Sequence, residues 1–200
     1  IDIIGQFGVG FYSAFMVSSE VKVISRAYDS DEAYCWISNG LDGYEIKKNS
    51  RDSYGTTVIL KIKEDTEDDK YSEFLESYRV QNLIRKYSNY ITYPIKMEVT
   101  HSKLKEGTKD DYEEVSELET INSMVPLWKK NKKEVDEKAL NDFYKSKFND
   151  YEDPLFSMFI KVDGMISYSA LLFIPSHAPY NLYSDNYEKG LQLYAKNIFI

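Results

Sequence analysis

Three glycines near the start of the chain have the type and spacing to bind an anion. Gly5, Gly8 and Gly10 lie within six positions and are followed at once by an apolar run from Phe11 to Val17, which predicts a loop that leads into a helix. Glycine lets the backbone take positive φ and approach a ligand closely, and the first N–H groups of a helix have no acceptor within it. Because the helix dipole also attracts negative charge at that end, the pattern predicts a phosphate-binding loop.

The spacing of these glycines separates the loop from the two commonest phosphate-binding motifs. Gly-x-x-Gly-x-Gly is the reverse of the dinucleotide-binding fingerprint, and no Gly-Lys-Ser/Thr follows to make a P-loop. Both of those folds are therefore disfavoured. On spacing alone, a tight turn before a buried helix explains the glycines equally well.

The elements that must position this loop are a set of short strands. Alternating residues and Gly-containing turns at Asn39-Gly40 and Asp42-Gly43 predict an antiparallel meander, in which Val58, Leu60 and Ile62 share one face of the last strand. An apolar stripe at helical spacing then predicts a helix over residues 71–87. A further strand begins near Pro94, which suits a strand start because it has no N–H. The meander strands are predicted at residues 20–26, 34–38, 44–47 and 57–63.

The composition changes between residues 100 and 119, where charged and polar residues show no sustained apolar period. We interpret this stretch as a domain boundary. His101 falls within it and is interpreted as a surface histidine without a carboxylate or cysteine partner.

After this boundary the sequence predicts a helix and a hairpin. Asp136 can cap a helix whose apolar stripe is Leu140, Phe143, Tyr144 and Phe148. Residues 156–162 and 165–174 predict strands joined across Asp163-Gly164. His177 lies among turn residues, so a catalytic role for it would need a partner that the sequence does not show.

The composition limits the classes of function. With 33 acidic and 25 basic residues the net charge is −8, which argues against nucleic acid or an anionic membrane as a partner. Cys35 is the single cysteine, so no intramolecular disulfide or Cys-rich metal site is expected, and a reducing cytoplasm fits. No apolar stretch approaches the roughly 20 residues that span a bilayer. The chain starts without methionine and stops on an apolar run, so we expect it to be an internal part of a longer protein.

The string from Gly5 to Ser13, followed by Phe15-Met16-Val17, resembles the lid-hinge motif of the heat shock protein 90 chaperone family in its bacterial form. The resemblance continues along nearly the whole chain. It includes Gly55-Thr56, Leu127-Trp128-Lys129 and residues 86–95 and 190–200. The sequence departs at Asn197, where family members commonly carry arginine; the strand there is expected to persist.

The resemblance implies an α/β fold of the α+β sandwich type. Residues 1–99 would form the C-terminal half of a GHKL (Bergerat-type) ATP-binding domain, residues 100–119 a short charged linker, and residues 120–200 the start of an α/β middle domain. The implied cofactors are ATP and Mg²⁺. The implied ATP phosphate-binding residues are Gly5, Gln6, Gly8, Val9, Gly10 and Phe11, with Thr56 on the adenine side.

No catalytic residue or magnesium ligand is assigned within the chain. In the resembled family the general-base glutamate, the magnesium-binding asparagine and the adenine-reading aspartate precede the position of Ile1, and the arginine that reaches the γ-phosphate follows that of Ile200. The chain alone is therefore expected neither to hydrolyse ATP nor to bind it tightly. Trp128 matches a position that contacts clients or the other domain.

The function implied is that of a cytoplasmic, stress-responsive ATP-dependent chaperone, an ATPase that binds unfolded clients and works as a homodimer. Two alternatives remain open. One is another GHKL ATPase, such as a topoisomerase, mismatch-repair protein or sensor kinase. The other is an interaction module that has kept the fold and lost ATP hydrolysis.

Overall fold

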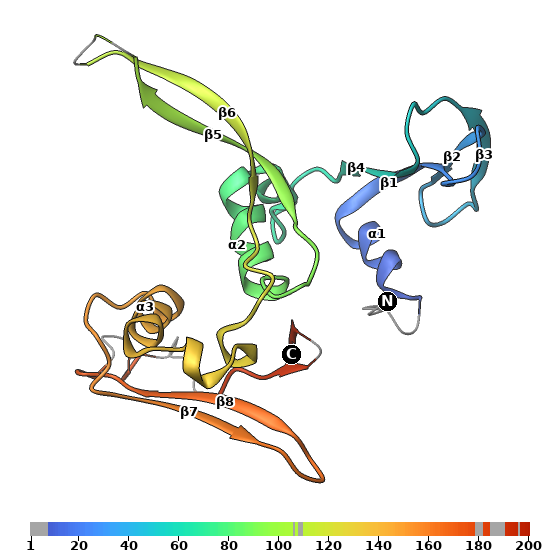
Figure 1. Cartoon of the computed structure of the whole chain (residues 1–200). Helices are drawn as coiled ribbons and strands as arrows, with labels where there is room; N and C mark the ends of the chain where they lie inside the picture. The colour runs from blue at the N-terminus through green and yellow to red at the C-terminus, as the bar shows by residue number, and fades with distance from the viewer. Residues whose placement is uncertain (1–7, 106, 108–109, 179–181, 185–190, 196) are drawn as a thin grey trace. The chain divides into compact units, whose positions relative to one another are not determined.

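The computed structural model describes residues 8–105, 107, 110–178, 182–184, 191–195 and 197–200 (Figure 1). Helices and strands are mixed throughout, as expected for an α/β chain. Its internal contacts divide the chain into two compact units, Ile1–Gln81 and Asn82–Ile200, and we describe each by itself. Gly5 and Gln6 lie outside the described residues.

The first unit is built on an antiparallel sheet in the order β3-β2-β1-β4. All four strands predicted from the sequence are confirmed, and Gly40 and Gly43, both with positive φ, lie in the turn between β2 and β3. The strands are β1 (Ser18–Arg26), β2 (Ala33–Ser38), β3 (Glu45–Asn49) and β4 (Gly55–Ile62).

Helical segments precede and follow this sheet along the chain. The predicted helix after the glycines is present as the 3₁₀ turn η1 (Gly10–Ser13), which continues directly into α1 (Ala14–Val17). The single helix predicted over residues 71–87 is instead two segments, η2 (Tyr71–Leu75) and α2 (Ser77–Tyr87). It is broken because Glu76 has an extended backbone, with φ −80° and ψ 120°. The division between the two units falls within α2.

Strand register assigns two neighbouring rows of side chains to the same face of the sheet, since directly opposed residues and residues two apart share a face. The rings of Phe11 and Phe15 lie 5.8 and 6.4 Å from that of Trp36, so η1 and α1 cover this face. We call the two sets the apolar row (Ile46, Trp36, Val23, Val58) and the polar row (Lys48, Tyr34, Ser25, Thr56).

The second unit contains two long hairpins, a helix and a small terminal hairpin. The predicted helix with its Asp136 cap is confirmed, because the Asp136 carboxylate accepts a hydrogen bond from the Ala139 N–H at 2.8 Å. The elements are β5 (Lys96–Leu104), β6 (Tyr112–Thr120), η3 (Leu127–Lys129), η4 (Lys132–Glu134), α3 (Glu137–Phe148), β7 (Phe156–Val162), β8 (Tyr168–Ile174), β9 (Tyr194–Ala195) and β10 (Ile198–Phe199).

A buried asparagine fixes the start of β5. Asn122 is 5% exposed; its Oδ1 accepts from the Ile95 N–H at 2.7 Å, and its Nδ2 donates to the carbonyls of Ile91 and Tyr93 at 2.9 Å each. These bonds hold the turn around Pro94 against the segment that follows β6. The prediction that a strand begins near Pro94 is confirmed, with β5 starting at Lys96.

Aromatic rings form the core of the second unit. Tyr90 is 4% exposed, and its ring lies 4.8 Å from that of Trp128 and 5.3 Å from that of Tyr194. A second group joins α3 to β8, where Phe173 packs against Phe143, Tyr144 and Phe148.

Three local predictions were wrong. Residues 100–119 were expected to lack regular structure, but most of them lie in the β5–β6 hairpin. His101 was expected to have no carboxylate partner, but its Nε2 lies 2.5 Å from Glu119 Oε1 across that hairpin. In place of the one strand expected near the C-terminus, Tyr194–Ala195 and Ile198–Phe199 form two short antiparallel strands, and Asn197 between them takes a left-handed φ of 69°. The strand after Asp163-Gly164 begins at Tyr168, three positions later than predicted. The linker role of residues 100–119 stays a prediction.

Candidate functional site

The exposed glycine turn at the start of η1 is the centre of the candidate site. Gly8 has a φ of +68°, and Gly8, Val9, Gly10 and Phe11 are all exposed. Val9 occupies the N-cap position and supplies no side-chain cap. Within the part of the chain that the structure describes, no side chain caps the N–H groups that open the helix, which suits this end to an anion.

The opposite end of this helical segment is held firmly. The Ser18 hydroxyl donates to the Ala14 carbonyl at 2.6 Å, Lys63 Nζ donates to the Met16 carbonyl at 3.0 Å, and the Lys63 N–H donates to the Val17 carbonyl at 3.0 Å. Carbonyls that would lack partners at a helix C-terminus are thus satisfied from β1 and β4. The helix is fixed at its last turn and exposed at its first.

The two described glycines of the turn differ in what they tolerate. A Cβ added to either Gly8 or Gly10 would meet nothing within 4 Å. Gly8 has positive φ, so a side chain there strains the backbone, whereas Gly10 has no such φ. A side chain at Gly10 would therefore leave the turn unstrained and project into the space that a ligand would use.

Thr56 lies on the same sheet face as this helix, in the polar row. Its Oγ1 is 2.9 Å from Ser25 Oγ, directly opposite on β1. Beside it, Val58 of the apolar row is 48% exposed. The face thus combines an apolar surface and a line of hydroxyls, which suits a flat heterocycle with a polar edge.

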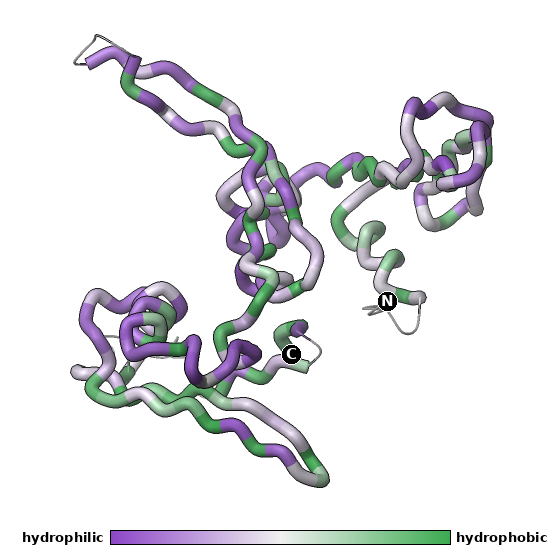
Figure 2. Tube along the Cα trace, viewed as in Figure 1, coloured by the Kyte–Doolittle hydropathy of each residue, from purple (hydrophilic) through white to green (hydrophobic). Residues whose placement is uncertain are grey.

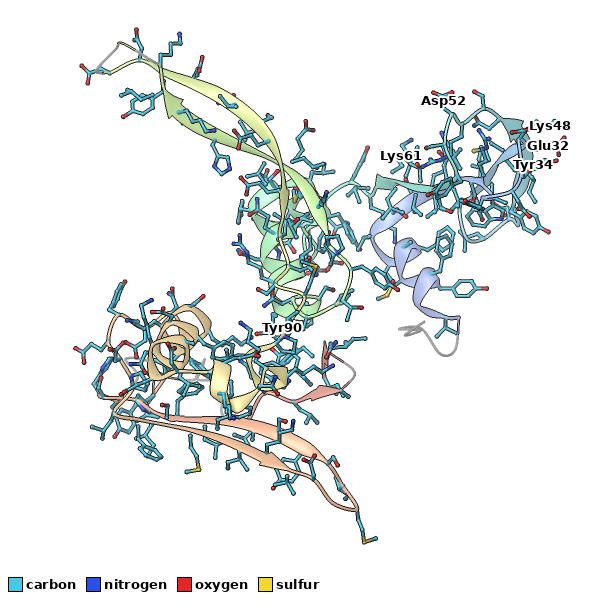
Figure 3. All side chains as sticks on the ribbon, viewed as in Figure 1. Glu32, Tyr34, Lys48, Asp52, Lys61 and Tyr90 are labelled. Carbon is cyan, nitrogen blue, oxygen red and sulfur yellow. The ribbon has the colours of Figure 1, made fainter. Side chains whose placement is uncertain are left out.

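The far end of the polar row is charged. The Tyr34 hydroxyl donates to Glu32 at 2.6 Å, and Lys48 Nζ donates to the other oxygen of that carboxylate at 3.2 Å. The Tyr34 hydrogen bond, assisted by Lys48, lowers the pKa of Glu32. Figure 3 shows these three side chains gathered at the edge formed by β2 and β3. They keep this edge ionised and hydrated, so we do not place a ligand there.

Trp128 lies within the aromatic core of the second unit. Its ring is 4.8 Å from that of Tyr90, 4.9 Å from that of Tyr194 and 6.3 Å from that of Phe143. It thereby joins the residues before β5 to α3 and β9. These contacts account for a tryptophan here, and its part in client or inter-domain contacts stays a prediction.

The described polar neighbours of His177 are not arranged as a histidine-activated nucleophile. Ser176 Oγ lies 3.2 Å from His177 Nδ1, yet it donates to Glu152 at 2.7 Å, so its hydrogen does not point at the imidazole. The carboxylates of Glu152 and Asp150 lie 3.7 and 3.9 Å from the ring nitrogens, beyond hydrogen-bond length. The group ties the turn after β8 to the loop after α3.

Sequence reasoning missed two residues of the first unit that the structure brings to the candidate site. Ser25 pairs with Thr56, and Lys63 holds the last turn of α1. Ser25 is 31 positions from Thr56 and Lys63 is 47 positions from Met16, so only the folded arrangement could have revealed these contacts.

Two further properties concern the described residues alone. Among them, no group of three or more His, Cys, Asp or Glu side chains is arranged to hold a metal ion. None of the helices seen in those residues has the length and apolar character needed to cross a membrane.

Comparison with known proteins gives consistent matches. The family model described as Hsp90 protein matches residues 98–200. Proteins named Chaperone protein HtpG from Clostridium perfringens, Bacillus subtilis and Shouchella clausii are 52%, 54% and 53% identical over 199 residues, which is essentially the full length of this 200-residue chain. This chain spans 32% of each of those relatives.

The aligned region extends over both units and so covers the glycine turn and Thr56, which lie outside the family-model match. The alternative interpretations, another GHKL ATPase or an interaction module, are not favoured by these matches. The family model alone covers more than half of the 200 residues. The chain belongs to the Hsp90 family.

Proposed function

We propose that the whole protein is an ATP-dependent molecular chaperone that binds unfolded or partly folded client proteins and assists their folding. The observation that carries the proposal is the identity of 52–54% over the full chain with proteins named as chaperones. The exposed, uncapped helix start at Gly10 supports the nucleotide-dependent part of it.

ATP fits the first unit in two places. The N–H groups of Gly8, Val9, Gly10 and Phe11 bind the terminal phosphates, together with those of Gly5 and Gln6, which lie outside the described residues. The base rests on the exposed surface of the apolar row, with the Thr56 hydroxyl at its polar edge. Both contacts lie on the face of the sheet that η1 and α1 cover.

The chain contributes binding and positioning to the ATPase cycle, while other parts of the protein supply the chemistry. No described cluster of side chains is arranged to hold Mg²⁺, so we route no step through the metal here. When bound, Mg²⁺ neutralises phosphate charge. The glycine turn orients the phosphates, and the sheet face with Val58 and Thr56 positions the base.

The proposed organisation follows from the family. Residues 1–99 complete a GHKL-type ATP-binding domain, residues 100–119 link it to the next domain, and residues 120–200 begin an α/β middle domain. The protein acts as a homodimer in the cytoplasm. Trp128, which packs in the aromatic core of the second unit, takes part in contacts with clients or with the other domain.

Calorimetry on the full-length protein tests the phosphate site. Gly10→Val places a side chain in the ligand space without straining the turn, and losing two charge-assisted hydrogen bonds of about 1.5–3 kcal/mol each weakens ATP binding about a hundredfold or more. Gly164→Val is the matched control, because a Cβ there also meets nothing within 4 Å and its φ is not positive.

The expected result is strong ATP binding by wild type and Gly164→Val and weak binding by Gly10→Val. ATP should also alter the ability of the wild type, and not of Gly10→Val, to prevent aggregation of a heat-denatured client. If Gly10→Val leaves the ATP affinity unchanged, the assignment of the phosphate-binding site to this glycine turn is wrong.

A further inference from the structure

The hydroxyl of Thr56 does not stand alone on its face of the sheet. Ser25 Oγ lies 2.9 Å from Thr56 Oγ1, and the two residues are directly opposed in the β1–β4 register. Each hydroxyl carries one hydrogen and two lone pairs, so the pair shares a single hydrogen between the two oxygens. The partner therefore decides whether Thr56 offers a donor or an acceptor to a third group.

The backbone around this pair is fixed by the next residue on β1. The Arg26 guanidinium donates to the Ser30 carbonyl at 2.7 Å and to the Arg51 and Asp52 carbonyls at 2.9 and 3.1 Å, and it pairs with Asp31 at 3.0 Å. Its side chain is only 22% exposed. These bonds hold the loops that enter β2 and β4, so the spacing between Ser25 and Thr56 is set by the scaffold.

The neighbouring row supplies the remaining surface. Val23 and Val58 are directly opposed on the same face, two positions from Ser25 and Thr56 respectively. A flat base that lies on Val58 brings its polar edge to the hydroxyl pair, where the direction of one hydrogen bond distinguishes an amino group from a carbonyl oxygen.

We propose that Ser25 is a positioning residue for the nucleotide, which orients the Thr56 hydroxyl and so sets the preference for one base over another. The inference rests on the proposed ATP-binding function and adds a residue to it. Ser25 acts through Thr56 and does not itself touch the ligand.

A double-mutant cycle on the full-length protein tests this role. The variants are Ser25→Ala, Thr56→Ala, the double variant and Ser25→Thr, and the readouts are calorimetric affinities for ATP and GTP together with the thermal midpoint. Ser116→Ala is the matched control, because Thr100 Oγ1 and Ser116 Oγ form an equivalent cross-strand pair at 2.9 Å on β5–β6.

Because Ser25→Ala removes one hydrogen bond, we expect it to weaken ATP binding about 3- to 10-fold and to lower the ratio of ATP to GTP affinity. Ser25→Thr restores both, since it keeps the hydroxyl. The double variant binds ATP no more weakly than Thr56→Ala alone, because Ser25 acts only through that residue. Ser116→Ala leaves affinity and base preference unchanged.

Three results would overturn the inference: wild-type ATP affinity and base preference in Ser25→Ala, additive losses in the double variant, or no loss in Thr56→Ala. In each case the phosphate site is judged separately by Gly10→Val. If the wild type binds no ATP at all, the proposed function fails and this inference falls with it. A lower thermal midpoint with unchanged ATP-to-GTP ratio identifies Ser25 as a purely structural cross-strand partner.

Discussion

Gly40 controls how the helix packs on the sheet. It has a φ of +81°, and a Cβ there would lie 2.9 Å from Cδ1 of Phe15, whose ring contacts Trp36. Gly40→Ala therefore adds a steric clash to the backbone strain of about 1–2 kcal/mol that a left-handed L-residue carries. We expect it to lower the free energy of unfolding of the first unit by about 2–3 kcal/mol.

The control for this prediction is Gly43→Ala. Gly43 also has positive φ, +92°, but a Cβ there meets nothing within 4 Å, so only the backbone strain remains. Urea unfolding followed by Trp36 fluorescence, in a chain with Trp128→Phe, measures both variants. Equal losses at the two glycines would show that Phe15 does not depend on Gly40.

Tyr90 makes the stability of the second unit sensitive to alkali. Burial, more than any other cause, raises the pKa of Tyr90 to about 12 from an ordinary value of 10.0. A raised pKa in the folded state gives stability that is complete below about pH 10 and is lost as pH rises towards 12. Tyr90→Phe should therefore show a smaller alkaline loss, measured as the pH dependence of urea unfolding by Trp128 fluorescence in a Trp36→Phe chain.

Tyr144 provides the internal comparison for that measurement. Burial, followed by its hydrogen bond to Asp150, also raises the pKa of Tyr144 to about 12. Part of the alkaline loss should thus remain in Tyr90→Phe. An unchanged pH profile in that variant would mean that Tyr90 ionises without cost to the fold.

Among the elements, the β5–β6 hairpin carries ion pairs that join its two strands. His101 pairs with Glu119 and Lys103 with Glu117 across the hairpin, and the neighbouring lysine, more than any other group, lowers the pKa of Glu117. Figure 2 shows hydrophilic stretches along both strands. Because an isolated two-stranded hairpin is only marginally stable, these ion pairs contribute noticeably to the stability of the hairpin.

Screening should therefore loosen this hairpin. Raising the ionic strength from 0.01 to 1 M shortens the Debye length from about 30 to about 3 Å. We expect amide exchange in β5 and β6 to speed up while exchange in the more apolar hairpin β7–β8 changes little. Equal changes in the two hairpins would contradict a charge-dependent β5–β6.

The elements that the sequence predicted are those with one apolar face. Val58, Leu60 and Ile62 recur with a period of two, with Lys61 and Lys63 on the other face, so β4 could be recognised. In the β5–β6 hairpin, Val115 and Leu118 fall on opposite faces, so no period of two is visible. The left-handed backbone at Asn197 involves a single residue, and it could not be recognised because the apolar run around it is typical of a continuous strand.

The residues of the candidate site likewise include some that could be predicted from the sequence and one that could not. The glycine turn is continuous in sequence and could be predicted, and Thr56 was assigned through the family resemblance. Ser25 could not, because its partnership with Thr56 exists only once β1 and β4 are paired in register.

For the whole molecule, we expect the backbone of both units to respond to whether ATP or ADP is bound. The segment Gly8–Val17 is exposed at its start and fixed at its end, so binding of a γ-phosphate orders its first turn. Through the linker, we expect the change to reach Val125–Asn131, around Trp128. Hydrogen exchange of the full-length protein with an ATP analogue and with ADP should differ in both segments.

Protection at Gly8–Val17 tests the central claim, nucleotide binding at this helix start, most directly. Amide exchange of the full-length wild type should slow in this segment when an ATP analogue replaces ADP, and Gly164→Val should respond in the same way. At an analogue concentration only a few times the wild-type Kd, Gly10→Val should show little or no such slowing. Identical exchange at Gly8–Val17 with the analogue, with ADP and without nucleotide would contradict the account.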